Sequence, residues 1–149
     1  MKFELKVLNN GKDLPIPKYQ TNQAAGMDIY SANPEKEEIR IQPGEYKLIP
    51  TGISISLPEG YEAQIRPRSG LAAKHGITVL NTPGTIDSDY RGEISIILVN
   101  LGKNDFNVAR GMRIAQMIIS PVSQFKIDIV DELDTTSRGE KGFGSTGEK

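Results

Sequence analysis

The segment 81–93 combines residues suited to binding with a residue suited to accepting a proton. It lies between the apolar runs 77–80 and 94–99, and this arrangement predicts a hairpin. Gly84 lets the backbone come close to a ligand, Asp87 directly follows the strand-like Ile86, and Tyr90 adds a flat ring. An acceptor carboxylate and a stacking surface would then share one scaffold. The segment predicts a site that grips a small planar molecule and carries out proton chemistry beside it.

Two further segments favour phosphate binding. Arg66-Pro67-Arg68-Ser69-Gly70 places a guanidinium and a hydroxyl at the start of a predicted short helix, where free amide groups and the helix dipole favour anions. The apolar run 113–119 is expected to be a strand that holds Gln116, a neutral donor, among apolar neighbours. A nucleotide polyphosphate could be reached from both segments.

The chain composition changes near Asp134, and the segment 134–149 is rich in glycine, serine and threonine, with a single apolar side chain. This segment is expected to be mobile without a ligand, because it has too little apolar surface to pack on the body. Phe143 could swing over a flat ligand while Ser145, Thr146 and nearby amides cradle phosphate oxygens, which predicts a closing lid. A P-loop is disfavoured, because Ser145 occupies the position where that motif requires lysine.

Composition limits the remaining function classes. The 149 residues are expected to form one folded body, and 18 basic against 19 acidic residues provide no basic field for a long nucleic acid. The absence of cysteine and the single histidine argue against a disulfide frame, a thiolate or histidine-rich metal site and a conventional serine triad. No apolar run approaches the roughly 20 residues of a membrane span, and Glu4 does not suit a signal peptide, so a cytoplasmic protein is expected.

The apolar pattern alternates with period two in several places, which is typical of half-buried strands. Frequent turn signals such as Asn10-Gly11 and Pro43-Gly44 separate these runs and favour an all-β sandwich or barrel. Only 69–76 looks helical, with Ser69 as a possible N-cap and Gly76 as the C-terminal stop. The alternating positions are Phe3, Leu5 and Val7; Ile53, Ile55 and Leu57; Tyr61, Ala63 and Ile65; and Phe125, Ile127 and Ile129.

Five motifs in order resemble those of the trimeric dUTPase family and span residues 24–147. Any one of them could arise by chance in a β-rich protein, but five with matching order and spacing make the resemblance specific. Met27, where a leucine is common, is the one departure. The motifs are Ala25-Gly26-Met27-Asp28-Ile29, Pro67-Arg68-Ser69-Gly70-Leu71, Gly84-Thr85-Ile86-Asp87-Ser88-Asp89-Tyr90-Arg91-Gly92, Arg113-Ile114-Ala115-Gln116, and Arg138-Gly139 with Gly142-Phe143-Gly144-Ser145-Thr146-Gly147.

The resemblance implies an all-β, jelly-roll-like barrel or sandwich with one short helix, covering residues 1–133. The segment 134–149 would be a flexible C-terminal arm that closes a neighbouring active site in a homotrimer. The implied reaction is hydrolysis of dUTP to dUMP and pyrophosphate, with Mg²⁺ held on the triphosphate. That reaction limits uracil in DNA and supplies dUMP for dTMP synthesis. Expected partners are dUTP and two further copies of the chain, with neither long nucleic acid nor membrane.

The resemblance also implies roles for particular residues. Asp87 would activate the attacking water, and Asp28 would reach the metal ion only through a water molecule. Asn81, Gly84 and Phe143 would recognise uracil, and Tyr90 would leave no space for a 2′-hydroxyl. The phosphates would be held by fixed donors. The full set of expected substrate-binding residues is Arg68, Ser69, Gly70, Asn81, Gly84, Thr85, Ile86, Tyr90, Gln116, Arg138, Phe143, Gly144, Ser145 and Thr146.

Two other functions stay open at this point. The family of dCTP deaminases shares the implied fold, although none of its catalytic pattern is clear in this chain, and ammonia release from dCTP would identify it. The chain could instead be a non-catalytic trimeric β module that binds partners through its tail. Such a module is disfavoured, because the chain has Asp87 as a base, Arg68 as a phosphate clamp and Phe143 as part of a lid. A protein that only binds partners does not need all three. In isolation, Asp87 would more often be a turn-forming residue.

Overall fold

The computed structural model describes residues 1–34, 37–140 and 142. Its described part is built mainly from short β-strands, with one α-helix, α1 (Ser69–His75), and one short 3₁₀ helix, η1 (Asn9–Gly11), so the predicted β-rich fold with a single short α-helix is confirmed. The strands are β1 (Glu4–Val7), β2 (Met27–Tyr30), β3 (Ile39–Ile41), β4 (Tyr46–Pro50), β5 (Ile53–Ser56), β6 (Tyr61–Arg66), β7 (Ile77–Val79), β8 (Gly84–Ile86), β9 (Ser95–Asn100), β10 (Phe106–Val108) and β11 (Arg113–Pro121).

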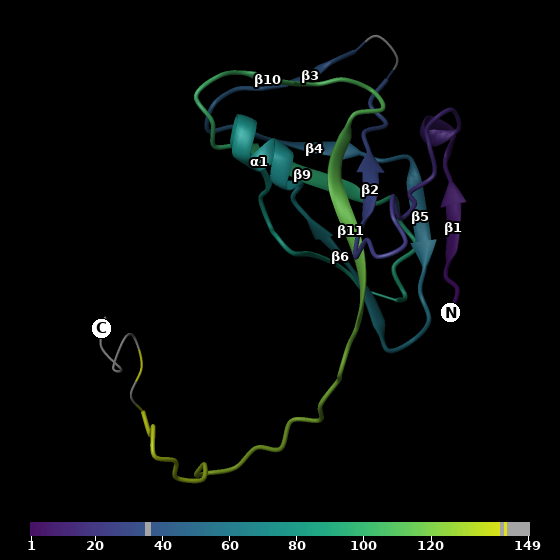
Figure 1. The fold of residues 1–149 in the computed structure, drawn as a ribbon. Coiled ribbons are helices and arrows are strands. Elements are labelled where there is room, and N and C mark those ends of the chain that lie inside the picture. Colours follow the sequence, from purple (N-terminus) through teal and green to yellow (C-terminus); the bar gives the residue numbers. More distant parts are fainter. Residues whose placement is uncertain (35–36, 141, 143–149) are drawn as a thin grey trace.

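Antiparallel pairing joins segments that are far apart in the sequence (Figure 1). The largest sheet has the strand order β2-β11-β6-β8, and a three-stranded sheet has the order β4-β9-β7. The pairs β1-β5 and β10-β3 complete the described ladders. Because β11 pairs with β2 on one side and β6 on the other, it brings the first, second and fourth motifs together.

The alternating side chains of these strands form one buried apolar cluster between the sheets. Ile29 from β2, Ile49 from β4, Leu98 from β9 and Met117 from β11 are each completely buried within it. Branched aliphatic side chains suit such a core, because they pack well on a pleated surface and have few rotamers to lose. This rigid core gives the outward-facing side chains of the same strands a fixed base.

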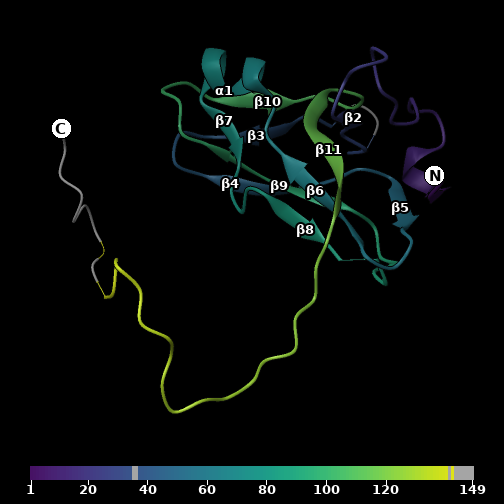
Figure 2. The ribbon, with the colours of Figure 1, turned by 60° about the horizontal axis from the view of Figure 1, so that its bottom comes forward.

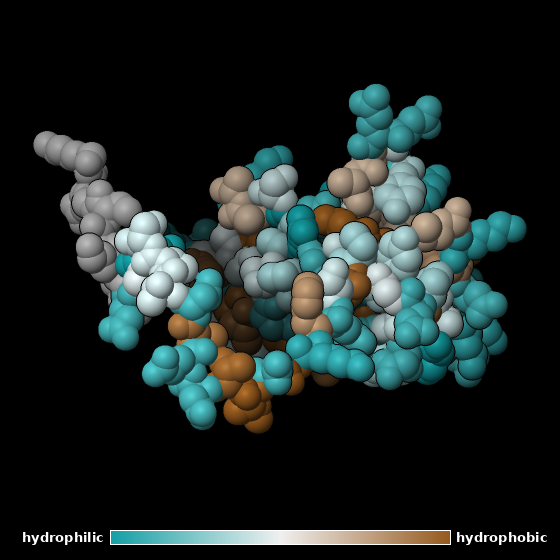
Figure 3. Space-filling model, turned by 90° about the horizontal axis from the view of Figure 1, so that it is seen from below, coloured by the Kyte–Doolittle hydropathy of each residue, from teal (hydrophilic) through white to brown (hydrophobic). Residues whose placement is uncertain are grey.

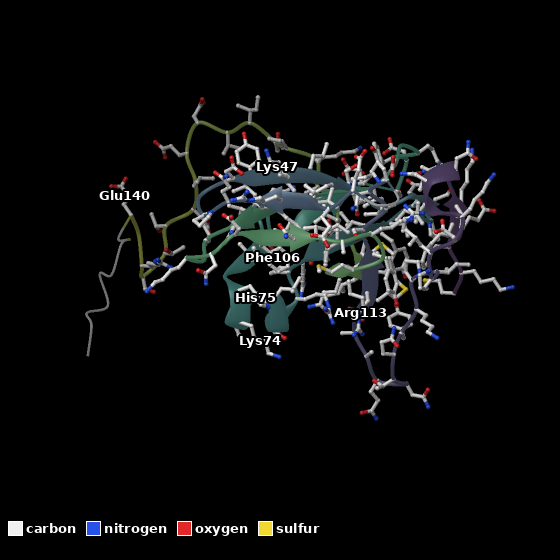
Figure 4. All side chains as sticks on the ribbon, turned by 90° about the horizontal axis from the view of Figure 1, so that it is seen from above. Lys47, Lys74, His75, Phe106, Arg113 and Glu140 are labelled. Carbon is white, nitrogen blue, oxygen red and sulfur yellow. The ribbon has the colours of Figure 1, made fainter. Side chains whose placement is uncertain are left out.

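The helix α1 ends as the sequence predicts but begins one residue earlier than expected. Gly76 adopts a left-handed conformation with φ of 70°, and its N–H bonds to the carbonyl of Ala72. The prediction that Ser69 is the N-cap is wrong: Arg68, with extended backbone, holds that position, and no side chain caps the helix. At the last helical position, the ring of His75 lies 5.4 Å from that of Phe106, and Figure 4 labels both residues.

The chain leaves the body after Pro121 as a long extended segment (Figure 2). The predicted strand at Phe125, Ile127 and Ile129 is not formed, and these side chains are 87%, 92% and 93% exposed. Hydrophobic side chains along this segment are prominent in Figure 3. Alternation shows that a segment could bury one face, but a strand also needs a ladder partner, which the body of the same chain does not provide here.

The boundary between folded domain and arm at residues 133 and 134 stays a prediction. Within the described residues, no helix combines the length and apolarity needed to cross a bilayer.

Candidate functional site

A row of three polar side chains crosses the outer face of the largest sheet. Gln116 in the middle strand β11 lies opposite Asp28 of β2 and opposite Arg66 of β6. Directly opposed residues in antiparallel strands project to the same face, and the neighbouring Met27, Ile65 and Met117 all face the core. The pairing register therefore places residues of the first and fourth motifs beside Arg66, which directly precedes the second motif.

Asp28 lies between two arginines at one end of this row. Its Oδ1 accepts a hydrogen bond from Nε of Arg68 at 2.9 Å, and its Oδ2 lies 3.2 Å from Nη1 of Arg113. Arg68 also donates from Nη1 to the main-chain carbonyl of Arg113 at 3.2 Å. The side chain of Asp28 is only 13% exposed, so these pairs are partly shielded from water.

The turn between β6 and α1 is held by the Gln116 side chain. Its Nε2 donates to the carbonyl of Pro67 at 3.0 Å, immediately before Arg68. Gly26 makes room for this amide, because a Cβ at position 26 would lie 2.7 Å from Oε1 of Gln116. Ser69 is exposed at the first helical position, next to Arg68. The predicted phosphate-binding residues Arg68, Ser69, Gly70 and Gln116 are thus gathered around one turn.

The apolar runs that flank the segment 81–93 pair antiparallel, as the predicted hairpin requires, but the segment between them also carries a strand of its own, β8. Within the described residues, β7 pairs with β9 in one sheet, whereas β8 pairs with β6 in the other, so the chain crosses between sheets at this point. Gly84 is buried where it pairs with Ile65, and an added Cβ would lie 3.3 Å from Nδ2 of Asn81. Asn81 and Gly84 are therefore neighbours, as a base-recognition role requires.

Asp87 and Tyr90 line one hollow of about 340 Å³, together with Thr85, Ile86, Leu48 of β4 and Glu93. Asp87 is exposed directly after β8, and the Tyr90 ring is held by a bond from its hydroxyl to the carbonyl of Glu93 at 3.0 Å. The structure thus brings together the expected carboxylate and the expected stacking ring. Asp87 also borders a larger hollow on the side of β6 and the start of the extended segment.

Glu93 fixes the chain segment that follows Tyr90. Its Oε1 accepts hydrogen bonds from the main-chain N–H of Gly52 and from Nδ2 of Asn10, both at 2.8 Å. This anchor ties the Tyr90 turn to η1 and to the start of β5. The sequence patterns did not single out Glu93, because its partners are far from it along the chain.

The two halves of the candidate site lie apart in one chain. Asp87 follows Ile86, which pairs with Ala63, so it lies at the Glu62 end of β6, while Arg68 follows the other end at Arg66. Four residues of strand span about 13 Å. A single chain therefore does not place Asp87 beside the Arg68 turn.

Of the residues expected in the arm, Arg138 is exposed in the described part, whereas Phe143, Gly144, Ser145 and Thr146 lie outside the described residues. In the described part of the chain, no group of three or more acidic or histidine side chains is arranged to hold a metal ion. Both oxygens of the Asp28 carboxylate contact arginine.

Comparisons with known proteins agree on one family. The family model described as dUTPase matches residues 12–147. The chain is 58% identical over 146 residues to a Maricaulis maris protein named deoxyuridine 5'-triphosphate nucleotidohydrolase, covering 98% of this chain and 96% of that protein. It is 59% identical over 140 residues to a Sinorhizobium medicae protein of the same name, covering 94% and 88%.

A solved structure shows the same fold. The dUTPase of Staphylococcus bacteriophage 80alpha, a G164S mutant with dUpNHpp, superposes with a TM-score of 0.86 at 28% identity. The superposition covers 98% of both chains.

Proposed function

The chain belongs to the dUTPase family, and we propose that it hydrolyses dUTP to dUMP and pyrophosphate. The observation that carries the proposal is the match over residues 12–147, within which the Arg68 turn and the Asp87 hollow both lie. An activity of this kind limits uracil in DNA and supplies dUMP for dTMP synthesis. We propose that the enzyme acts in the cytoplasm, where free nucleotides are its substrate.

In the proposed mechanism, the Asp87 carboxylate orients a water molecule and accepts its proton as the water oxygen bonds to the α-phosphorus. The bond from that phosphorus to the bridging oxygen breaks, and its electron pair leaves with pyrophosphate. The exposed position of Asp87 at the edge of the Tyr90 hollow supports this role, because a substrate sugar on the ring would bring the α-phosphate near the carboxylate.

Arg68 and Ser69 are proposed to bind the phosphates, with Gln116 beside them and Arg138, Ser145 and Thr146 of the arm closing over them. Support comes from the Arg68 guanidinium. Its Nε donates to Asp28 and its Nη1 to the carbonyl of Arg113, whereas within the described part of the chain Nη2 donates to no protein acceptor. Fixed donors of this kind stabilise negative charge without reorganising during the reaction.

The residues present fit Mg²⁺ held mainly by substrate. Magnesium prefers oxygen ligands and keeps several of its waters, so the phosphates can hold it without a protein cage, and it would neutralise charge on them. Both oxygens of Asp28 already accept from guanidinium groups, so Asp28 fits at most an outer contact through water.

Recognition of the base is proposed to use Asn81 and the close-packed backbone at Gly84, with Phe143 closing from the other side. The buried position of Gly84 beside Ile65 supports this, because a methyl group on the pyrimidine ring would meet packed atoms. Each mismatched polar group on cytosine would cost about 1–3 kcal/mol. Tyr90 under the sugar would leave no room for a 2′-hydroxyl. Gly70, Thr85, Ile86 and Gly144 complete the proposed contacts.

We propose that the active unit is a homotrimer with sites between subunits. The separation of Asp87 from the Arg68 turn within one chain supports this, because one dUTP molecule needs both. Leu48, which borders the Asp87 hollow, is 64% exposed and Tyr46 on the same strand is 62% exposed, which leaves an apolar strand face open for a neighbouring copy.

Pyrophosphate release with dUTP, dTTP, dCTP and UTP, each with and without Mg²⁺, tests the proposal. We expect rapid, magnesium-dependent release from dUTP and little from the other three nucleotides. Comparable rates with dTTP or UTP would contradict the recognition scheme. Ammonia release from dCTP would instead identify a deaminase, and no turnover with any nucleotide would leave a binding module.

A further inference from the structure

An irregularity in β11 turns Arg113 toward the phosphate-binding turn. Pairing with β2 runs Gln116 to Asp28 and Ala115 to Ile29, but the next pair joins Arg113 to Tyr30, so Ile114 is an extra residue. Ile114 and Ala115 are consecutive and both buried, 1% and 0% exposed. In a regular strand, Arg113 would share the inward face of Ala115, two residues away. The bulge instead sends Arg113 outward, onto the face of Asp28.

Arg113 is connected to Arg68 in two ways. Through its side chain, Nη1 reaches Oδ2 of Asp28, whose other oxygen accepts from Nε of Arg68. Through its main chain, the carbonyl accepts from Nη1 of Arg68. Figure 4 shows Arg113 on the side of the molecule where α1 lies. The Arg68 guanidinium is thus held at two of its nitrogens by groups that Arg113 supplies or orients.

Two contacts on one carboxylate restrict its rotation more than one contact does. An Asp28 bound only to Arg68 could turn about its terminal torsion and carry the guanidinium with it, because that torsion is broad. The second arginine fixes the plane of the carboxylate, and partial burial strengthens both charge-assisted bonds. The outcome is a fixed direction for the remaining N–H groups of Arg68.

We propose that Arg113 is a positioning residue that acts through Asp28 to orient the Arg68 guanidinium toward the substrate polyphosphate. This inference rests on the proposed function for the identity of the ligand, but its geometry does not depend on turnover. Arg113 itself does not touch the reacting atoms. Its role differs from that of Asp28, whose carboxylate transmits the orientation.

The first test compares Arg113→Met, which cannot donate a hydrogen bond, with Arg113→Lys, which restores one donor for Asp28. We expect Arg113→Met to raise KM for dUTP about fivefold with kcat changed less than twofold, and Arg113→Lys to stay within twofold of wild type. Arg40→Gln is the matched control, because Arg40 lies on β3 and pairs with Asp105 rather than with Asp28. It should leave KM unchanged. Equal loss in Arg113→Met and Arg113→Lys would overturn the proposal.

The second test places Arg113→Met in an Asp28→Asn background. If Arg113 acts through the carboxylate, the second substitution adds less than a twofold effect on KM there. A full fivefold effect in that background would mean that Arg113 attracts the ligand directly, and would refute a positioning role. A fall in melting temperature for Arg113→Met much larger than that for Arg40→Gln, in parallel with the KM change, would also refute it.

Binding of inorganic pyrophosphate, measured by calorimetry on the same variants, separates this inference from the proposed function. We expect Kd to weaken about fivefold in Arg113→Met and to recover in Arg113→Lys. A wild-type protein that binds pyrophosphate but does not hydrolyse dUTP would contradict the proposed function and leave the positioning role intact. Unchanged pyrophosphate binding in Arg113→Met would contradict the positioning role even if the enzyme hydrolyses dUTP.

Discussion

Substitution of Gly26 by alanine should damage substrate binding without damaging the fold. The added Cβ would lie 2.7 Å from Oε1 of Gln116 and 3.3 Å from Cγ1 of Ile118. Gly26 does not have a positive φ, so its backbone accepts alanine without strain. The end of the Gln116 side chain is the part that can move, and its movement breaks the 3.0 Å bond from Nε2 to the carbonyl of Pro67.

The expected magnitudes follow from these contacts. Loss of one neutral hydrogen bond costs about 1 kcal/mol. Replacement of glycine by alanine at a compatible position returns about 0.4–1 kcal/mol by restricting the unfolded chain. The free energy of unfolding should therefore change by less than about 1 kcal/mol. If the lost bond loosens the turn that carries Arg68, the same 1 kcal/mol appears in dUTP binding as a roughly fivefold rise in KM.

Pyrophosphate-release kinetics and urea denaturation measure these two quantities on the same preparation. The control is a double-mutant cycle with Gln116→Ala, which removes both the clashing amide and its bond to Pro67. In that background Gly26→Ala should change KM less than twofold. If it still raises KM fivefold, the Gln116 contact is not the cause. If it lowers the free energy of unfolding by several kcal/mol in either background, Gly26 supports the fold in some other way.

Four further outcomes are expected. Asp87→Asn should bind nucleotide normally and lose several orders of magnitude in turnover, measured by pyrophosphate release; near-normal turnover would remove Asp87 as the base. Truncation after Asp134 should leave a folded protein by circular dichroism with little activity, and full activity would argue against a closing arm. Mixing Asp87→Asn chains with truncated chains should restore some activity, whereas none would argue for sites within one chain. A hydrogen bond from Arg110 lowers the pKa of Asp13. The stability that this pair contributes is therefore present above the ordinary aspartate pKa and is lost as the pH falls through the lowered pKa. In urea denaturation, Asp13→Asn should lose less stability than wild type between neutral pH and about pH 3.

The sequence was a good guide where local chemistry decides the outcome. Alternation predicted β1, β5 and β6, and the glycine at position 76 ends α1 through its left-handed backbone. The residues expected to bind phosphate, Arg68 and Gln116, do meet at one turn. In each case the deciding interaction is short in range, or is a burial pattern that repeats along one strand.

The predictions failed where a distant partner decides the outcome. The runs on either side of 81–93 pair with each other as the hairpin predicts, but only the full fold shows that β8, between them, pairs with β6. The alternation at 125–129 likewise has no ladder partner in its own chain. Arg113 lies in the fourth motif, but the sequence alone predicts no role for it. Its neighbours Ile114 and Ala115 are both apolar, which is the one local sign of the bulge.

Because β11 lies between β2 and β6, the phosphate-binding turn is complete only when β11 pairs in the correct register. Gln116 is level with Asp28 on one side and Arg66 on the other, and side chains alternate along a strand. Sliding β11 by one residue would turn Gln116 into the core and put Met117 in its place, so no misaligned chain keeps a weakened version of the turn. In a refolding experiment, the specific activity should therefore rise in proportion to the number of correctly aligned molecules. The KM for dUTP should stay unchanged throughout refolding.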